Sequence, residues 1–284
     1  MTGTKPNAIP QPMDDTRLHL YVAWGCPFCH RVLATLALTG LRDQVTYTWM
    51  RNIKSEAGWE IEPGDDPLLG ATFLADVYGQ LEPRAGHRPS VPLLVDLSAK
   101  TLLSSSSPEI TRYFAGGMNG TRPVRRDLCP VDLVGQIDWM NAWLHDNVNR
   151  AVYIVGFSTE QADYEEKVGK LFSSLDELES RLATQPYLLG KNLTESDVYL
   201  LATLERFDSV YYPLFKCSYR RVAEYPALSN YREQLRAIDG VSETYNHVCT
   251  KEHYFCSVMH VGGEVRNLNP SRVVPVDTFT LEPT

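Results

Sequence analysis

Two cysteines three residues apart constrain this chain most, because they stand where a predicted strand gives way to a predicted helix. The apolar residues Leu18–Ala23 predict a short buried strand, and Cys26 and Cys29 follow after a turn. Pro27 suits the first turn of a helix, where its missing N–H is not needed. The apolar run Arg31–Thr39 then predicts the body of that helix. A strand, a Cys-Pro-x-Cys turn and a helix together predict a βαβ unit.

The Cys26 sulfur is thereby placed just ahead of the unpaired N–H groups of a helix. Those groups and the helix dipole favour a thiolate over a thiol. Thiols at such positions have pKa values of roughly 3.5–7.5 instead of about 8.5. Cys26 is therefore the predicted nucleophile.

Three other interpretations of the cysteine pair are weaker. A structural zinc site needs a second pair of ligands, and Cys249 and Cys256 are spaced too far apart to fit one. Cys26 to His30 matches the pattern for covalent haem attachment, which usually requires export, but the polar N-terminus lacks the apolar core of a signal peptide. Two ordinary core cysteines remain the plain structural alternative. We predict no metal.

Val91-Pro92 is a second, independent signal. A proline that opens a strand is where thioredoxin-like folds place a cis proline, whose preceding backbone pairs with a cysteinyl peptide. A proline at the start of an edge strand is the alternative interpretation. With the Cys-Pro-x-Cys turn, the dipeptide predicts a thioredoxin-like fold.

The pattern of apolar residues divides the chain. An α/β thioredoxin-like domain is predicted at residues 18–114, and helical periodicity from residue 131 onward predicts an all-α domain at 131–260. Its last helix is expected at Val241–His247. Ala115–Pro130 is predicted to be a linker, and residues 261–284 a C-terminal tail whose role the sequence does not reveal.

Charge and composition narrow the class of protein. Lys and Arg number 27 against 35 Asp and Glu, a formal net charge of −8, which disfavours nucleic acid or an anionic membrane as partner. No stretch approaches the roughly 18 apolar residues of a membrane helix. Six cysteines are too few for a disulfide-stapled scaffold. We expect reduced thiols and a cytoplasmic protein.

Several segments resemble the glutathione-transferase fold, namely Val22–Arg31 (VAWGCPFCHR), Gly58-Trp59, Val91-Pro92 and Ser104–Arg112. The helical half resembles the Xi class, the glutathionyl-hydroquinone reductases. The segments that carry this resemblance are Asn147–Phe157, Leu193–Lys216 with Arg206-Phe207-Asp208 and Tyr211, Ala223–Leu228, and His253-Tyr254. The resemblance extends from about Leu18 to Pro275.

That resemblance implies roles for particular residues. Cys26 matches the family nucleophile, which attacks the sulfur of a glutathionyl-hydroquinone, and a second glutathione then releases the mixed disulfide. Trp59, Val91 and Ser107 match positions that hold glutathione, Val91 through its backbone and Ser107 through its hydroxyl and the helix N-terminus. The family's active-site tyrosines, whose hydroxyls bind the thiolate or donate a proton to the leaving carbon, match Tyr153, Tyr211 and Tyr254. Without the resemblance, each tyrosine would be interpreted as a buried packing residue.

Two departures from the family pattern bear on mechanism. Cys29 stands where the family normally has alanine, so it is a candidate resolving thiol that could release the mixed disulfide within the protein. Ser106 stands where the family usually has an acidic residue before the glutathione-binding serine. Losing that carboxylate predicts weaker binding of the ammonium group of glutathione, or use of another low-molecular-weight thiol such as mycothiol.

Two rival functions remain open from the sequence. One is a general thioltransferase or dehydroascorbate reductase of the Omega type. The other is a catalytically inactive transferase-fold interaction module. In the favoured case the partners are a small aromatic or quinone-derived thiol conjugate and a second copy of the chain in a homodimer.

Overall fold

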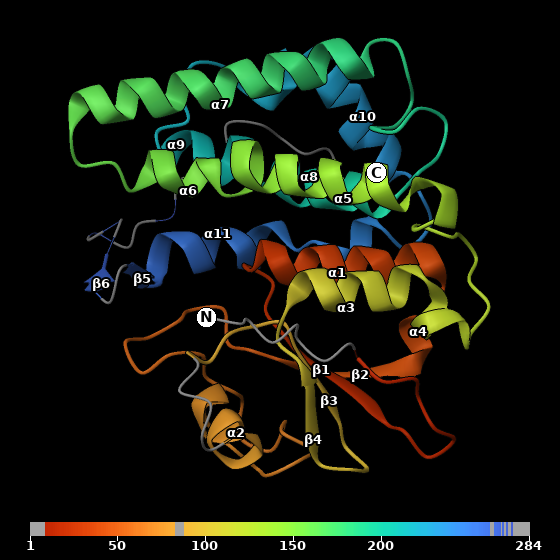
Figure 1. Cartoon of the computed structure of the whole chain (residues 1–284). Helices are drawn as coiled ribbons and strands as arrows, with labels where there is room; N and C mark the ends of the chain where they lie inside the picture. Colours follow the sequence, from red (N-terminus) through yellow and green to blue (C-terminus); the bar gives the residue numbers. More distant parts are fainter. Residues whose placement is uncertain are drawn as a thin grey trace, which may run out of the picture.

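The chain folds into a four-stranded sheet with flanking helices at one end and a stack of helices at the other (Figure 1). The computed structural model describes residues 9–82, 88–261, 264–267, 269, 271 and 274. No helix in this part of the chain is both long enough and apolar enough to span a bilayer. The arrangement is the thioredoxin-like and all-α combination that the sequence predicts.

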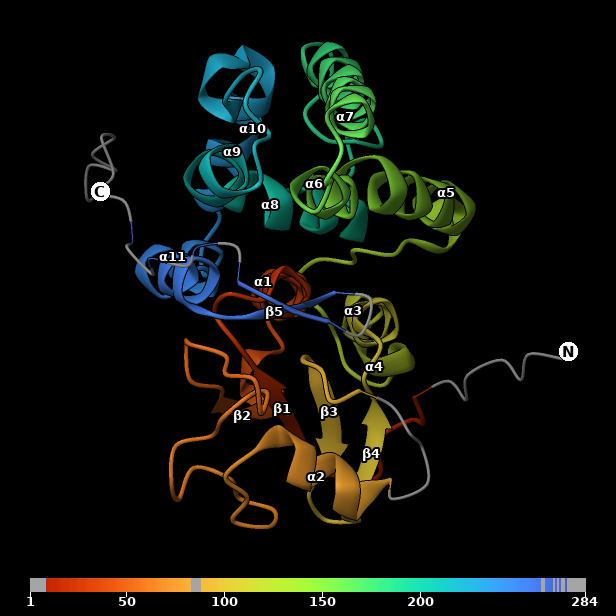
Figure 2. The same ribbon diagram turned by 90° about the vertical axis from the view of Figure 1, so that its left-hand side faces the viewer.

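The sheet has the strand order β2-β1-β3-β4, with β1 parallel to β2 and antiparallel to β3, and β3 antiparallel to β4. Its strands are β1 (Leu18–Val22), β2 (Val45–Trp49), β3 (Leu93–Asp96) and β4 (Thr101–Ser104). Helices α1 (Pro27–Thr39) and α3 (Ser107–Ala115) cover the face toward the helical half, and α2 (Leu74–Leu81) covers the other face (Figure 2). Because both faces of β1 are covered, all five of its residues are buried.

Helix α1 joins the two halves of the molecule. It begins after Cys26, whose sulfur accepts a hydrogen bond from the Cys29 N–H, and it ends at Gly40, which adopts the left-handed conformation at φ 75°. Ala34 belongs to the core of the helical half, whereas Val32 belongs to the core around the sheet. The residue at the start of α1 therefore lies at the junction of the two halves.

The helical half is built around α8 (Glu195–Arg206), in which every residue is buried. The other helices are α4 (Gly117–Gly120) in the linker, α5 (Val134–Leu144), α6 (Ala151–Gly156), α7 (Gln161–Leu182), α9 (Tyr212–Leu214), α10 (Pro226–Arg236) and α11 (His247–Cys256). Thr194 and Asp197 form a capping box at the start of α8. Two π-helical segments, His145–Asn149 and Phe207–Tyr211, extend α5 and α8.

The last helix differs from the prediction. The expected helix at Val241–His247 is wrong, because the chain there forms only a short 3₁₀ turn, Ser242–Thr244. Helix α11 begins instead at His247, where the side chain of Asn246 caps it by accepting from the Cys249 N–H at 2.9 Å. It returns to the start of α1 (Figure 1).

The domain boundaries 18–114, 131–260 and 261–284 stay predictions. Across the predicted start of the tail, β5 (Met259–Val261) pairs with β6 (Glu264–Arg266) as an antiparallel hairpin. Most of the remaining tail lies outside the described residues.

Candidate active site

A pocket of about 300 Å³ opens at the N-terminus of α1, between the sheet and the helical half. Five residues singled out from the sequence line it, although they come from widely separated segments: Cys26, Trp59, Val91, Tyr153 and Tyr254. The fold therefore gathers most of the predicted site at one place.

Cys26 occupies the floor of this pocket and is almost entirely buried, at 7% exposed. Its sulfur accepts from the Cys29 N–H at 3.4 Å and lies 3.5 Å from the Val91 carbonyl oxygen. The Val91–Pro92 peptide bond is cis. Burial acts to raise the pKa of Cys26, but hydrogen bonds from Cys29 and the charge of Arg206 outweigh it, so the pKa lies below its ordinary value.

Cys29 lies next to Cys26 but does not line the pocket. Its side chain is fully buried and accepts a hydrogen bond from the Ala23 N–H at 3.5 Å. Burial raises its pKa well above the ordinary value, and the hydrogen bond to Cys26 and the charge of the Cys26 thiolate raise it further. Cys29 is therefore a protonated thiol that can donate to Cys26.

Arg206, at the end of α8, fixes the turn that leads into Cys26. Its fully buried guanidinium donates to the carbonyl oxygens of Trp24 at 3.0 Å and Gly25 at 3.3 Å. It also donates to the Ala202 carbonyl oxygen at 2.9 Å and lies 2.9 Å from His30 Nδ1. Burial and the Arg206 charge hold the pKa of His30 well below its usual value, so His30 is neutral and cannot assist as a cation.

Three tyrosine hydroxyls meet beside the pocket. Tyr153 Oη lies 2.6 Å from Tyr254 Oη and 3.4 Å from Tyr211 Oη, and the last two oxygens are 3.2 Å apart. Tyr153 and Tyr254 line the pocket, whereas Tyr211 lies behind them and is fully buried. Burial raises the pKa of all three hydroxyls above the ordinary value. Each is therefore protonated near neutral pH.

Two cations beside Trp59 were not predicted from the sequence. The rings of Trp59 and His253 stack at 5.0 Å, and Lys54 places its ammonium 5.4 Å from the Trp59 ring centroid. Burial, followed by the charge of Arg88, lowers the pKa of Lys54 to about 8. Lys54 and Arg88 both line the pocket, but they lie in a long irregular stretch whose path the sequence does not indicate.

Ser106 and Ser107 stand apart from the lining residues of the pocket. Ser106 caps α3, accepting from the Glu109 N–H at 3.5 Å, and Ser107 is buried at the first position of that helix. Because β3 and β4 are antiparallel, the C-terminal end of β4, which leads to these serines, lies beside the N-terminal end of β3, which Val91 precedes. They are placed where an extended ligand held at Val91 could reach the start of α3.

The part of the chain that the structure describes contains no group of three or more His, Cys, Asp or Glu side chains suited to hold a metal ion.

A cysteine of lowered pKa at a helix start, beside a cis-proline backbone and next to an all-α half, is the arrangement of the glutathione-transferase fold. The family model described as glutathione S-transferase, C-terminal domain, matches residues 161–234. Glutathionyl-hydroquinone reductase PcpF of Sphingobium chlorophenolicum is 36% identical over 264 residues, which are 92% of this chain and 82% of that protein.

Two solved structures agree over nearly the whole chain. The glutathione-bound structure of YqjG, a glutathione transferase homologue from Escherichia coli K-12, has a TM-score of 0.84 at 34% identity and covers 97% of this chain and 87% of that one. The Xi-class transferase of Natrialba magadii has a TM-score of 0.86 at 31% identity, with 95% and 83% covered. The chain belongs to the Xi-class glutathione transferases, the glutathionyl-hydroquinone reductase family.

Proposed function

We propose that this protein is a cysteine-dependent thiol transferase that reductively removes glutathione from hydroquinone conjugates. The observation that carries the proposal is the meeting of the Cys26 sulfur and the tyrosine hydroxyls of Tyr153 and Tyr254 in one pocket. Such a site combines a nucleophile for sulfur with proton donors for carbon, which is what this reaction requires.

In the first step, the Cys26 thiolate attacks the sulfur that joins glutathione to the aromatic ring. A disulfide forms between Cys26 and glutathione as the carbon–sulfur bond breaks. The electron pair of that bond stays with the ring carbon, which takes a proton from a tyrosine hydroxyl. The ring leaves as free hydroquinone.

The three tyrosines act as one proton-donating unit. When Tyr153 gives up its proton, the Tyr254 hydroxyl 2.6 Å away can donate to the resulting phenolate. Arg206 contributes positive charge that counteracts the rise in pKa of Tyr211 and Tyr254 caused by burial. The unit therefore holds a proton at rest and stabilises the anion that its release leaves behind.

In the second step, the thiolate of another glutathione attacks the mixed disulfide. Glutathione disulfide leaves, the Cys26 thiolate returns, and the proton lost by the incoming thiol restores the tyrosine. Cys29 is a weak candidate for this attack because it is fully buried, is protonated and does not line the pocket. We propose a cycle that uses Cys26 alone, with Cys29 donating a hydrogen bond to it.

The charges of the pocket favour glutathione over mycothiol. Lys54 and Arg88 line it, and no Asp or Glu is among its lining residues. Glutathione carries two carboxylates, whereas mycothiol carries no net charge. The positive charges of Lys54 and Arg88 therefore favour binding of glutathione. Ser106 offers a hydroxyl where an acid would pair with the glutathione ammonium, and we therefore expect modest affinity.

The test is turnover of a glutathionyl-hydroquinone with glutathione, measured as hydroquinone and glutathione disulfide formed in equal amounts. Cys26→Ser should abolish turnover, because a serine hydroxyl is hardly ionised near neutral pH. Cys129→Ser, in the linker, is the matched control and should retain it. Full turnover by Cys26→Ser would remove the proposal.

Two comparisons in the same assay separate the rivals. If the protein turns over dehydroascorbate but not the hydroquinone conjugate, an Omega-type enzyme is favoured. If it turns over neither substrate, an inactive interaction module is favoured. Mycothiol replaces glutathione in a parallel reaction, and preference for mycothiol would overturn the assignment of the thiol. We further propose that the protein is cytoplasmic and forms a homodimer. Light scattering would measure the mass of the assembly and so test the dimer.

A further inference from the structure

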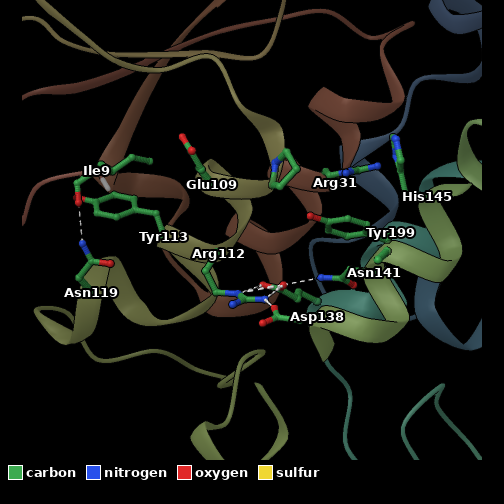
Figure 3. Close-up of a pocket in the computed structure, with 13 residues that line it drawn as sticks. Ile9, Arg31, Glu109, Arg112, Tyr113, Asn119, Asp138, Asn141, His145 and Tyr199 are labelled. Carbon is green, nitrogen blue, oxygen red and sulfur yellow. Dashed lines mark hydrogen bonds and ion pairs between the residues drawn. The ribbon is translucent and has the colours of Figure 1, made fainter. Parts of the chain in front are cut away.

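A second and larger cavity, of about 540 Å³, lies between α3, α5 and α8, with Arg31 of α1 at one end (Figure 3). It shares no lining residue with the pocket of Cys26. The two cavities are nevertheless close in the chain, because Cys26 caps α1 and Arg31 follows within its second turn.

Arg31 is a buried cation whose pKa is lowered by burial, an effect that the Tyr199 hydroxyl and the charges of Cys26 and Glu195 offset only in part. Its side chain is only 2% exposed, and its Nε atom has no hydrogen-bond partner among the residues that the structure describes. The guanidinium is 3.8 Å from the Tyr199 ring centroid and 5.0 Å from that of Phe28. No carboxylate among the described residues lies within ion-pair distance of it. A buried charge is costly unless it is paired, so Arg31 is poised for an anion from outside.

The nearby carboxylates are already engaged by another arginine. Glu195 accepts from Arg112 Nε at 2.9 Å and Nη2 at 2.6 Å, and from Asn141 Nδ2 at 2.7 Å. Asp138 also pairs with Arg112, at 2.6 Å. Both carboxylates therefore lie against Arg112, and neither is within ion-pair distance of Arg31.

The rest of the cavity is suited to an aromatic body. Ile9, Pro108, Tyr113 and Tyr199 contribute apolar and aromatic surface to its lining. Within the described part of the chain the buried Tyr113 hydroxyl has no hydrogen-bond partner, and Figure 3 shows Tyr113 at the end of the cavity away from Arg31. Glu109 also lines the cavity, and its charge disfavours ligands with several negative charges, such as nucleotides.

We propose that this cavity binds an aromatic monocarboxylate, with the carboxylate paired to Arg31 and the ring held against Tyr199. The site is separate from the catalytic pocket and takes a ligand without a thiol. It is therefore independent of whether Cys26 performs the proposed reaction.

The test is calorimetric titration with naphthalene-2-carboxylate and with the uncharged 2-naphthamide of the same shape. The protein is first alkylated at Cys26 with iodoacetamide, so that the catalytic pocket is blocked. The carboxylate should bind about ten- to hundredfold more tightly than the amide, since a hydrogen-bonded charge at a buried site discriminates by this much.

Three variants locate the binding. Arg31→Met should remove the preference for the carboxylate. Ala142→Trp, which fills the cavity from an exposed position on α5, should abolish binding of both probes without touching Arg31. Arg126→Met, at an exposed arginine of the linker, is the matched control and should behave as the parent.

Equal affinity for carboxylate and amide would overturn the proposal. So would a preference that survives Arg31→Met, or binding that alkylation of Cys26 eliminates. If Arg31→Met proves unfolded by circular dichroism, Ala142→Trp decides, and unchanged binding by that variant would refute the site.

Discussion

Replacing Arg206 with lysine keeps a positive charge but removes the planar fork that holds the turn before Cys26. In the native protein, the guanidinium serves the carbonyl oxygens of Trp24, Gly25 and Ala202, together with the ring of His30. A lysine ammonium is a single point on a flexible stem and cannot reach four acceptors arranged around a guanidinium plane.

The size of the effect follows from the acceptors left without a donor. The Trp24 carbonyl keeps the Thr250 hydroxyl as a second donor at 3.1 Å, whereas Gly25 and His30 face a fully buried side chain, where water cannot replace the lost hydrogen bonds. If lysine leaves two acceptors unsatisfied, at about 1–3 kcal/mol each, the free energy of unfolding should fall by about 2–6 kcal/mol. Arg125→Lys, at an exposed arginine, should change it by less than about 0.5 kcal/mol.

Urea unfolding followed by circular dichroism measures both variants. Arg206→Met adds a second readout, because it removes the charge that helps to lower the pKa of Cys26. In this variant, the rate at which iodoacetamide alkylates Cys26 should therefore rise at a higher pH than in the parent. A loss of less than about 1 kcal/mol in Arg206→Lys, below the cost of a single orphaned acceptor, would refute the assigned role.

Three further changes have defined outcomes. Cys29→Ser should keep kcat within about threefold of the parent, as expected if Cys29 does not react, and a loss of more than about tenfold would assign it a resolving role. Gly25→Ala should lower the free energy of unfolding by about 1–3 kcal/mol, because its Cβ would lie 2.3 Å from the His253 ring; an unchanged urea midpoint would contradict this. Ser106→Glu should lower KM for glutathione by about two- to fivefold at constant kcat by supplying a carboxylate for the ammonium, and an unchanged KM would place the ammonium elsewhere.

The sequence was most informative where chemistry and local structure coincide. Cys26 and Val91 could be predicted because a Cys-Pro-x-Cys turn and a strand-opening proline have local geometric meaning, and the structure brings both residues to one pocket. Arg206 drew notice only through family resemblance. Its contacts with Trp24 and Gly25 span about 180 positions of the chain, and no local pattern encodes a contact of that range.

Other parts of the site could not be predicted, for physical reasons. Lys54 and Arg88 lie in irregular segments, whose paths depend on tertiary packing and not on periodicity. The burial of Cys29 could not be predicted either. A second cysteine three residues after the first is compatible both with a thiol that resolves the mixed disulfide and with one that only donates a hydrogen bond. The start of α11 differs from the prediction because the Asn246 side chain caps the helix there, a signal that apolar periodicity does not contain.

The ionisation of Cys26 in the resting enzyme is the central claim, and ultraviolet titration of thiolate absorbance measures it directly. Subtracting the same titration of Cys26→Ser isolates this one sulfur from the other five cysteines. The account predicts a midpoint below the value of about 8.5 for an ordinary cysteine, so that thiolate is present as pH rises toward neutrality. A midpoint at or above that value would contradict it.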